Sequence, residues 1–381
     1  MSDAPLEEKK ARAAAFLKKY RTSVGKKGST VVADFADKLP EQYQSFPRLH
    51  LGIPSLDTFF GGGLPLGGLI TVAGDTSVGK TTFALRVVAA AQKQGKLIAY
   101  CDAEGTLDLE WARKQGVDTS SLVVLTSGMS SEENFTPTTL EDYLNGVSEA
   151  VNAGIFDLAI LDSLDAMIAR GRVQSGKSGA KRDLDDKDIA LKARVMSDFY
   201  PRILGAMRGN STTLLQIGQL RASGIGGPFV SLQMSGGNAR KYYDLLTLSI
   251  RRGARSEAPT DGLIELGYAF IMKTAKSKIS GIREGSDMKT AFFFDQGFDP
   301  TYELTVQALD RGVIKKKGNA AAEYTTSTGE VHNIRAGKDY KIAAYIKENN
   351  LDDDLLLQVT GELTPVMEAV LDTDTAEEDA A

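Results

Sequence analysis

One short motif constrains this 381-residue chain more than any other feature. Residues Gly74–Thr81 read GDTSVGKT, which matches the pattern G-x-x-x-x-G-K-S/T at every fixed position. The apolar run Leu69–Ala73 precedes the motif, and a helical pattern over Thr81–Gln94 follows it. A strand that ends in a glycine loop and continues into a helix presents backbone N–H groups to an anion. The motif therefore predicts a loop that binds nucleotide phosphates, with a chance glycine turn as the alternative.

A metal site is expected next to this loop. Lys80 is predicted to bridge the outer phosphates, and the Thr81 hydroxyl is predicted to ligate Mg²⁺. The apolar run Ile155–Leu161 leads to Asp162. An acid that follows a buried strand lies at the sheet edge where ligands bind, so we predict that Asp162 holds Mg²⁺ through water. The alternative role for Asp162 is a helix cap.

Hydrolysis also requires a group that orients or activates water. The run Leu97–Cys101 continues into Asp102 and Glu104. We predict that Glu104 has this role because it follows the strand directly at the same sheet edge. Asp102 competes for the role, and a surface carboxylate or cap is the plain alternative for Glu104.

Short apolar runs alternate with helical patterns through the middle of the chain. This alternation predicts an α/β fold with a mostly parallel sheet and helices on both faces. The later runs are closer together and can pair antiparallel. The strand candidates beyond the phosphate loop are Leu97–Cys101, Ile155–Leu161, Thr212–Ile217, Leu245–Ile250, Tyr268–Met272 and Ala291–Phe294.

The two ends of the chain have patterns of their own. Residues Glu7–Tyr20 have a helical pattern, and Ser29–Phe35 alternates like a short strand. These elements can pack on their own core or dock on a neighbouring copy. A short helix is predicted over Asp339–Glu348. We divide the chain into residues 1–45, the helix and strand that contact another subunit; 46–298, the core; 299–365, a small C-terminal domain; and 366–381, an acidic disordered tail.

The net charge of −5 comes from the C-terminus. Residues 351–381 hold 10 acids and no Lys or Arg, which leaves 45 basic and 40 acidic residues before them. The run Asp372–Asp379 is either a solvated tail or a screen that competes with an acidic partner for a basic surface. No run is long enough to span a bilayer, and the N-terminus has no apolar signal core, so we expect no membrane partner and a cytoplasmic protein. The single cysteine, Cys101, is expected to be a buried thiol in a reducing compartment.

Several motifs follow one another in the order and approximate spacing of a known family. They are GDTSVGKT, then DAEGTLD at 102–108, ILDS at 160–163, QIGQLR at 216–221 and SGGNARKYY at 235–243. From about residue 10 to 350 the chain resembles the RecA recombinases. The resemblance implies a RecA-like P-loop ATPase core that uses ATP and Mg²⁺.

The resemblance also implies roles for individual residues. Glu104 would activate the attacking water, and Gln219 would sense the γ-phosphate. Lys276 and Lys278 would reach the ATP of a neighbouring subunit, although solvent lysines are the plain alternative. Asp108 and Trp111 would lie near the adenine. Together with these two, the expected nucleotide-binding residues are Gly74, Asp75, Thr76, Ser77, Val78, Gly79, Lys80, Thr81 and Thr82.

Two segments are predicted to be long flexible loops, Gly171–Lys187 and Ala222–Gly237. Cations there would meet DNA phosphates, and apolar side chains would contact bases. Two disordered surface loops are the alternative. The helix expected over Ile189–Arg208 contains Pro201, which leaves open whether it is bent or split. The candidate DNA-binding residues are Arg194, Ser197 and Arg221, by resemblance, and Phe229, Gly236, Gly237 and Asn238.

The function predicted from these features is a DNA-dependent ATPase of DNA recombination and repair. It would assemble as a helical homo-oligomeric filament on single-stranded DNA and exchange strands with duplex DNA. One alternative is a ring-forming helicase or motor with a similar core. Another is an ATP-gated, single-strand-binding scaffold with negligible turnover.

Overall fold

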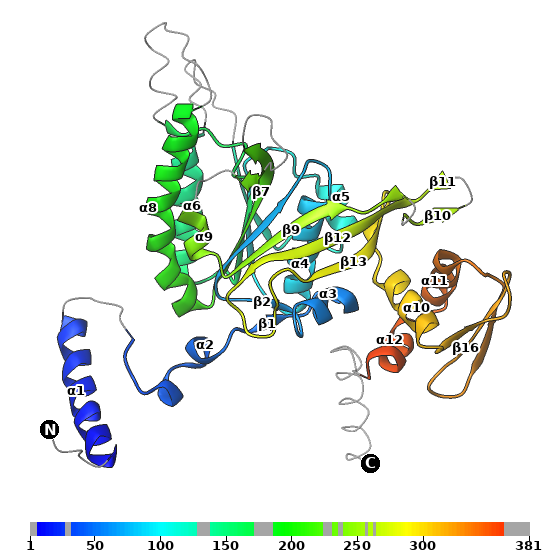
Figure 1. Ribbon diagram of the computed structural model, residues 1–381, viewed down its shortest axis with the longest axis horizontal. Coiled ribbons are helices and arrows are strands. Elements are labelled where there is room, and N and C mark those ends of the chain that lie inside the picture. Colours follow the sequence, from blue (N-terminus) through cyan, green and yellow to red (C-terminus); the bar gives the residue numbers. More distant parts are fainter. Residues whose placement is uncertain are drawn as a thin grey trace, which may run out of the picture. The chain divides into compact units, whose positions relative to one another are not determined.

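The computed structural model describes residues 6–26, 32–127, 138–170, 186–223, 231–234, 239–255, 258–261 and 264–361. The chain divides into two compact units, Met1–Pro47 and Arg48–Ala381. Each unit is described by itself (Figure 1). Among these residues no helix is both long and apolar enough to cross a bilayer.

The first unit is built on helix α1, Leu6–Lys26. The helix predicted over Glu7–Tyr20 is thus confirmed and extends further at its C-terminal end. None of its residues is buried, and the side chains of Leu6 and Phe16 are 67% and 62% exposed. Two short helices follow, η1 at Ala36–Lys38 and α2 at Glu41–Gln44.

The strand predicted over Ser29–Phe35 is wrong in its described part. Residues 29–31 lie outside the described residues, and Val32–Phe35 belong to no strand. Alternation alone does not make a strand, because the backbone also needs a neighbour to complete its hydrogen bonds. Here α1 supplies a partner instead: Arg21 Nε donates to Ala33 O at 2.7 Å, and its guanidinium pairs with Asp34.

The second unit is built around a ten-stranded sheet of described residues in the order β14-β13-β12-β9-β3-β7-β6-β4-β5, with β8 beside β7. The strands from β9 to β5 in this order are mutually parallel, as predicted. Strands β12, β13 and β14 are antiparallel, as their close spacing suggested. The bounds are β3 Leu69–Gly74, β4 Ile98–Asp102, β5 Leu122–Thr126, β6 Leu158–Asp162, β7 Thr213–Ser223, β8 Ser231–Met234, β9 Leu246–Arg252, β12 Gly267–Ser277, β13 Asp287–Phe293 and β14 Gly297–Phe298.

Helices cover both faces of this sheet (Figure 1). On one side lie α6 (Leu140–Ala153), α8 (Asp186–Asn210) and α9 (Ala239–Tyr243), and on the other α4 (Lys80–Lys93) and α5 (Leu109–Lys114). Side chains of α6 and α8 pack against alternate residues of the strands, including Cys101, which is buried as predicted. Removal of these apolar surfaces from water is the main source of stability.

The helix with the internal proline is one element, since α8 runs from Asp186 to Asn210 through Pro201. Both Pro201 and Ser197, four residues earlier, are exposed. Water can therefore satisfy the carbonyl that has lost its N–H partner. The first loop was predicted to extend to Lys187, but Asp186 and Lys187 already lie in α8; residues 171–185 lie outside the described residues.

The second predicted loop, Ala222–Gly237, is partly a β-hairpin, which corrects that prediction. Strand β7 continues to Ser223 and pairs antiparallel with β8, with Leu220 opposite Met234 and Ser223 opposite Ser231. The glycines of this segment favoured a loop, whereas backbone pairing with β7 places residues 231–234 in a strand. Residues 224–230 and 235–238 lie outside the description.

The unit begins with two small features, the β1–β2 pair (Arg48–Leu49 with Leu64–Pro65) and helix α3, Pro54–Phe59. A further pair, β10–β11, joins Thr260–Asp261 to Ile264–Glu265. The C-terminal region consists of α10 (Pro300–Asp310), β15 (Ile314–Lys316), β16 (Ala322–Thr325), β17 (Val331–Ile334), α11 (Asp339–Glu348) and α12 (Asp352–Thr360) around a core of its own. Helix α11 has the predicted bounds, and the tail at 366–381 lies outside the described residues.

Candidate functional site

The phosphate loop has the predicted strand–loop–helix form. Strand β3 ends at Gly74, and α4 begins at Lys80 after Gly79, whose φ is 92°. Only glycine adopts that conformation without strain. A Cβ on Gly74 would lie 2.6 Å from the Ile250 carbonyl oxygen. The loop is therefore tightly wound, and the N-terminal end of α4 points to the carboxyl edge of the parallel strands.

Lys80 is folded onto this loop. Its Nζ donates to Gly74 O at 3.2 Å and to Asp75 O at 2.6 Å. The side chain is buried, and burial lowers the pKa of the ammonium group because it disfavours the charged form. The carboxylates nearby, Asp162 first and then Glu104, oppose that shift in pKa. The positive charge thus lies among acids at the end of the loop.

Asp162 lies next to Thr81, as the two motifs predicted. Thr81 Oγ1 donates to Asp162 Oδ2 at 2.8 Å, and the phenol of Tyr100 donates to the same oxygen at 2.8 Å. Burial raises the pKa of Asp162, while these two hydrogen bonds lower it. Tyr100 was not among the residues predicted from the sequence. It reaches the site because of the register of β4 on β6, which pairs Tyr100 with Ile160 and Asp102 with Asp162 and so places Tyr100 and both acids on the same face of the sheet.

The structure separates the two acids that competed for the water-activating role. Asp102 is buried, and its carboxylate accepts hydrogen bonds from the backbone N–H groups of Gly105, Thr106 and Leu107. It therefore shapes the loop after β4. Glu104 is exposed and accepts a hydrogen bond from the Ser163 hydroxyl, next to Asp162. Of the two, Glu104 is the carboxylate available to a water molecule.

Asp108 and Trp111 lie at the start of helix α5. Asp108 is its N-cap and accepts from the backbone N–H groups of Glu110 and Trp111. The half-buried indole of Trp111 donates from Nε1 to Thr82 Oγ1 at 3.1 Å. The indole therefore borders the first turn of α4, and Asp108 holds the helix that carries it.

Gln219 lies directly beside the phosphate loop, because it is the register partner of Gly74 across the β3–β7 pair. Its backbone N–H donates to Asp165 Oδ2 at 2.6 Å. No role was predicted for Ser163 or Asp165 from the sequence, where the only signal was their position one and three residues after Asp162. These contacts bring the ends of β3, β6 and β7 together.

Lys276 and Lys278 lie toward the opposite end of the strands. Lys276 on β12 is paired with Thr247 of β9, which is itself paired with Thr71 of β3, three residues before Gly74. A strand rises about 3.3 Å per residue, so three residues place Lys276 about 10 Å from Gly74 along the strand direction. Lys278 Nζ donates to the Tyr242 carbonyl. The two lysines are thus not brought to the phosphate loop of their own chain.

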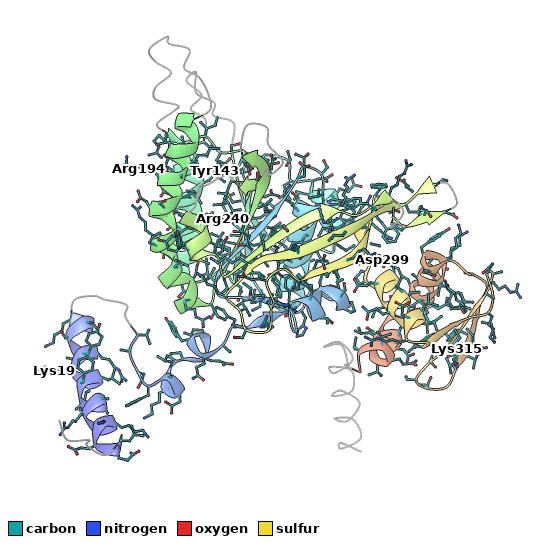
Figure 2. All side chains as sticks on the ribbon, in the orientation of Figure 1. Lys19, Tyr143, Arg194, Arg240, Asp299 and Lys315 are labelled. Carbon is teal, nitrogen blue, oxygen red and sulfur yellow. The ribbon has the colours of Figure 1, made fainter. Side chains whose placement is uncertain are left out.

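The candidate DNA residues are only partly described. Arg194 is exposed on α8 (Figure 2). Ser197 is also exposed, and it lies three residues further along and so on the same helix face. The Ser197 hydroxyl donates to Ala193 O at 2.7 Å. Arg221 lies on β7 opposite Gln233, and its side chain is not described. Phe229, Gly236, Gly237 and Asn238 lie outside the described residues.

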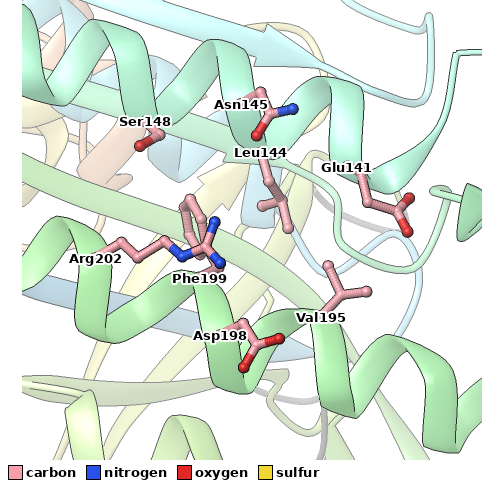
Figure 3. Close-up of a pocket in the computed structure, with 8 residues that line it drawn as sticks. All are labelled: Glu141, Leu144, Asn145, Ser148, Val195, Asp198, Phe199 and Arg202. Carbon is pink, nitrogen blue, oxygen red and sulfur yellow. The ribbon is translucent and has the colours of Figure 1, made fainter.

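A pocket of about 190 Å³ lies between α6 and α8 (Figure 3). Glu141 and Leu144 line it from α6, and Phe199 and Arg202 from α8. None of the predicted site residues with described side chains lines it. The pocket and the phosphate loop are therefore separate features.

Comparison with known proteins identifies the family to which this site belongs. The model of the RecA N-terminal domain matches residues 17–299. The chain belongs to the RecA family. Protein RecA of Thermotoga neapolitana is 30% identical over 345 residues, 90% of each chain. Protein RecA of Mycobacteroides abscessus is 33% identical over 321 residues, 84% of each chain. A plasmid-encoded Protein RecA of Lactococcus lactis is 31% identical over 314 residues, 82% of this chain and 83% of the relative.

The large sheet and the helices that cover it therefore form a RecA-like α/β core. Membership of the family also assigns the chain in general terms to DNA recombination and repair, as an ATP-binding and DNA-binding protein with DNA-dependent ATPase activity at the level of the family.

Proposed function

We propose that this chain forms helical filaments on single-stranded DNA and uses ATP hydrolysis to drive homologous pairing and strand exchange with duplex DNA. The observation that carries the proposal is the course of strand β7. The strand holds Gln219 beside Gly74 and runs without a break to Ser223, where it pairs with β8. One rigid element therefore links the phosphate loop to the segment predicted to bind DNA.

The residues at the carboxyl edge fit ATP with Mg²⁺. Thr81 and Asp162 offer a hydroxyl and a carboxylate oxygen within 2.8 Å of each other, and Mg²⁺ prefers oxygen ligands. The loop leaves no room for a Cβ at Gly74. When bound, Mg²⁺ neutralises charge on the outer phosphates. The proposed phosphate-binding set is Gly74, Asp75, Thr76, Ser77, Val78, Gly79, Lys80, Thr81 and Thr82, with Asp108 and Trp111 beside the base.

The chain's own groups then have distinct tasks. The Glu104 carboxylate, held by the Ser163 hydroxyl, accepts a proton from the attacking water. The Lys80 ammonium exchanges its two carbonyl partners for phosphate oxygens. Gln219, whose side chain is partly buried next to Gly74, responds to the outermost phosphate. A change at Gln219 moves β7 and so reaches the hairpin.

The position of Lys276 and Lys278 supports a site completed by a second copy. Cations supplied in trans stabilise the charge of phosphoryl transfer, as an arginine finger does. Contacts between different surfaces of successive copies make a filament when the rotation does not close. Residues 1–45 are proposed to supply one such contact, since α1 buries none of its own residues. Residues 46–298 form the proposed core, and 299–365 and the acidic tail at 366–381 follow it, in a cytoplasmic protein.

The proposed DNA surface joins α8 to the β7–β8 hairpin. Arg194 and Ser197 are exposed on the helix, and Arg221 is on the hairpin. Cations on this surface would bind phosphates in a salt-dependent way. Phe229, Gly236, Gly237 and Asn238 are proposed to contact bases and backbone from the neighbouring segments.

The test is ATP hydrolysis with and without single-stranded DNA, on the wild-type chain and on Lys80→Ala, with the same samples imaged by electron microscopy. We expect hydrolysis that DNA stimulates and that Lys80→Ala lacks, together with nucleotide-dependent helical filaments. Closed rings would favour a helicase-like motor. Nucleotide binding without turnover under either condition would favour a scaffold and would remove Glu104 from the mechanism.

A further inference from the structure

A line of polar side chains crosses the otherwise apolar middle of the sheet. Gln216 of β7, Thr71 of β3, Thr247 of β9 and Lys276 of β12 are successive register partners on four neighbouring strands. We call these four residues the polar rung. Gln216 and Thr71 are completely buried, and the residues before and after them on β3 and β7 are buried and apolar. Buried polar groups require hydrogen-bond partners, so the rung requires a structural explanation.

The carboxylate of Asp244 supplies those partners. Thr71 Oγ1 donates to Asp244 Oδ1 at 2.8 Å, and Thr247 Oγ1 donates to Oδ2 at 2.8 Å. Gln216 Nε2 in turn donates to Thr71 Oγ1 at 2.7 Å. Asp244 is completely buried directly after helix α9. Its side chain thus links the end of α9 directly to β3 and β9, and through Thr71 to Gln216 of β7.

Helix α9 is tied down in further ways. Arg240 NH1 donates to Asp244 Oδ2 at 3.1 Å, and the Arg240 side chain is only 7% exposed. Tyr243 stacks at a tilt on Tyr200 of α8, with ring centroids 5.6 Å apart, and the Tyr200 phenol donates to Gln216 Oε1 at 3.1 Å. The network therefore closes on itself across α8, α9 and the sheet.

Three of the four strands of the rung, β3, β7 and β12, carry residues of the proposed mechanism. Thr71 lies three residues before Gly74 on β3, and Gln216 lies three residues before Gln219 on β7. Lys276 is one of the two lysines proposed to act in trans. Helix α9 begins at Ala239, directly after Asn238, the last of the candidate DNA-binding residues in the sequence. The polar rung thus lies beneath the nucleotide edge, and α9 connects it to the DNA segment.

Stability alone does not account for this arrangement. Apolar side chains of similar volume often match or exceed a buried ion pair in stability, whereas loss of one partner leaves an uncompensated charge. A buried hydrogen-bond network is directional, because each donor and acceptor fixes the next. Displacement of α9 would therefore disturb the bonds of Asp244 to Thr71 and Thr247 and so act on β3 and β9.

We propose that Asp244 is a positioning residue that couples DNA binding to ATP binding, by locking helix α9 to the polar rung beneath the phosphate loop and Gln219. The inference rests on the proposed function and names the part of the chain through which its two ligands influence each other. Coupling of this kind is reciprocal: each ligand raises the affinity for the other by the same factor.

The decisive variant is Thr71→Val, which has nearly the same shape but lacks the hydroxyl that joins Gln216 to Asp244. Thr71→Ser restores the hydroxyl and serves as the rescue. Thr305→Val is the matched control, because it removes a completely buried threonine hydroxyl from α10, where its partner is Thr301 O at 2.8 Å.

Two titrations measure the coupling. Anisotropy of a labelled oligo(dT) gives the DNA affinity with and without a slowly hydrolysed ATP analogue. Fluorescence of Trp111, the single tryptophan, gives the analogue affinity with and without oligo(dT). In the wild-type chain each ligand should raise the affinity for the other by about 5–150-fold. In Thr71→Val that factor should fall at least about fivefold, with each affinity measured alone within about twofold of wild type.

The outcomes are separable. The proposal is supported if the factor by which each ligand raises the affinity for the other is lost in Thr71→Val, returns in Thr71→Ser and is unchanged in Thr305→Val. A coupling factor in Thr71→Val equal to that of the wild-type chain would overturn it. Equal loss of both separate affinities would also overturn it, since the rung would then only support the fold. If neither ligand changes the affinity for the other in the wild-type chain, the proposed function itself is overturned, and the coupling with it.

Discussion

Asp162, at the end of strand β6, and Asp244, directly after helix α9, are both buried carboxylates, and their hydrogen-bond partners differ in one respect. Asp162 is bonded by two neutral hydroxyl groups, those of Thr81 and Tyr100, at the carboxyl edge of the strands. Asp244 is bonded by the hydroxyls of Thr71 and Thr247 and also by the guanidinium of Arg240. Burial raises the pKa of both. A carboxylate whose charge is balanced within the chain suits a structural link, whereas one bonded only by neutral donors suits a cation.

The largest expected effect is the loss of ATP hydrolysis when Asp162, the carboxylate proposed to hold Mg²⁺, is changed. Asp162→Asn keeps the volume but removes the charge, so Mg²⁺-dependent ATP hydrolysis should fall at least about 100-fold, the scale for loss of one preorganised electrostatic partner. Steady-state hydrolysis over a Mg²⁺ series measures it. Glu149→Gln, which alters an exposed carboxylate of α6, is the control. Wild-type turnover in Asp162→Asn would show that the metal is held elsewhere.

For Asp244, the carboxylate with a structural role, we expect instead a loss in the free energy of unfolding. Asp244→Ala leaves the buried guanidinium of Arg240 without its partner, which should cost about 3–5 kcal/mol. Asp162→Ala breaks hydrogen bonds to neutral hydroxyls alone, since the nearby Lys80 ammonium keeps its two carbonyl partners, and it should cost less. Urea unfolding of the two variants side by side measures the difference, and equal losses would remove the distinction between the two carboxylates.

Tyr100 offers a smaller and more specific test. Tyr100→Phe removes one donor from Asp162 Oδ2, and loss of a residue that orients a metal ligand typically lowers metal affinity about 10-fold or more. A Mg²⁺ titration followed by Trp111 fluorescence with ADP present measures the change. Tyr143→Phe, at a buried tyrosine of α6, is the control. An unaltered Mg²⁺ midpoint would mean that Thr81 alone orients Asp162.

The smallest effect concerns Cys101, the neighbour of Tyr100 on the opposite face of β4. Burial raises the pKa of its thiol to about 12, so almost no reactive thiolate exists at pH 8. A colorimetric thiol reagent should modify the folded chain very slowly and release one equivalent after unfolding in urea. Rapid modification of the folded chain would contradict the packing of α6 and α8 over this strand.

The contrast also explains what the sequence could predict. Gly74–Thr81 and Asp162 were identified because backbone geometry demands particular residues at fixed spacing, and those demands are local. Glu104 was predicted for the water-activating role with Asp102 as a competitor, and the sequence alone could not eliminate that competitor, because it is the loop over Asp102 that occupies its carboxylate. The alternation at Val32–Phe35 wrongly predicted a strand, because a strand also depends on a partner from elsewhere in the chain.

Tertiary partners were the part that local patterns could not predict. Asp244 follows a motif that the sequence analysis singled out, yet nothing in its neighbours shows that it meets Thr71, which is 173 residues away. Tyr100 and Ser163 are ordinary residues of their segments until the register of β4 on β6 brings them to the site. The β7–β8 hairpin was missed for the same reason, since glycines favoured a loop and the pairing is not local.

Homologous pairing tests the central claim most directly. A labelled single strand, the protein and ATP·Mg²⁺ are mixed with a supercoiled duplex of matching sequence, and the joint molecules are resolved on a gel. We expect joint molecules that require ATP and homology and that are absent with Lys80→Ala. Strand-binding and ATP hydrolysis without any joint molecules, or unwinding of the duplex without pairing, would contradict it.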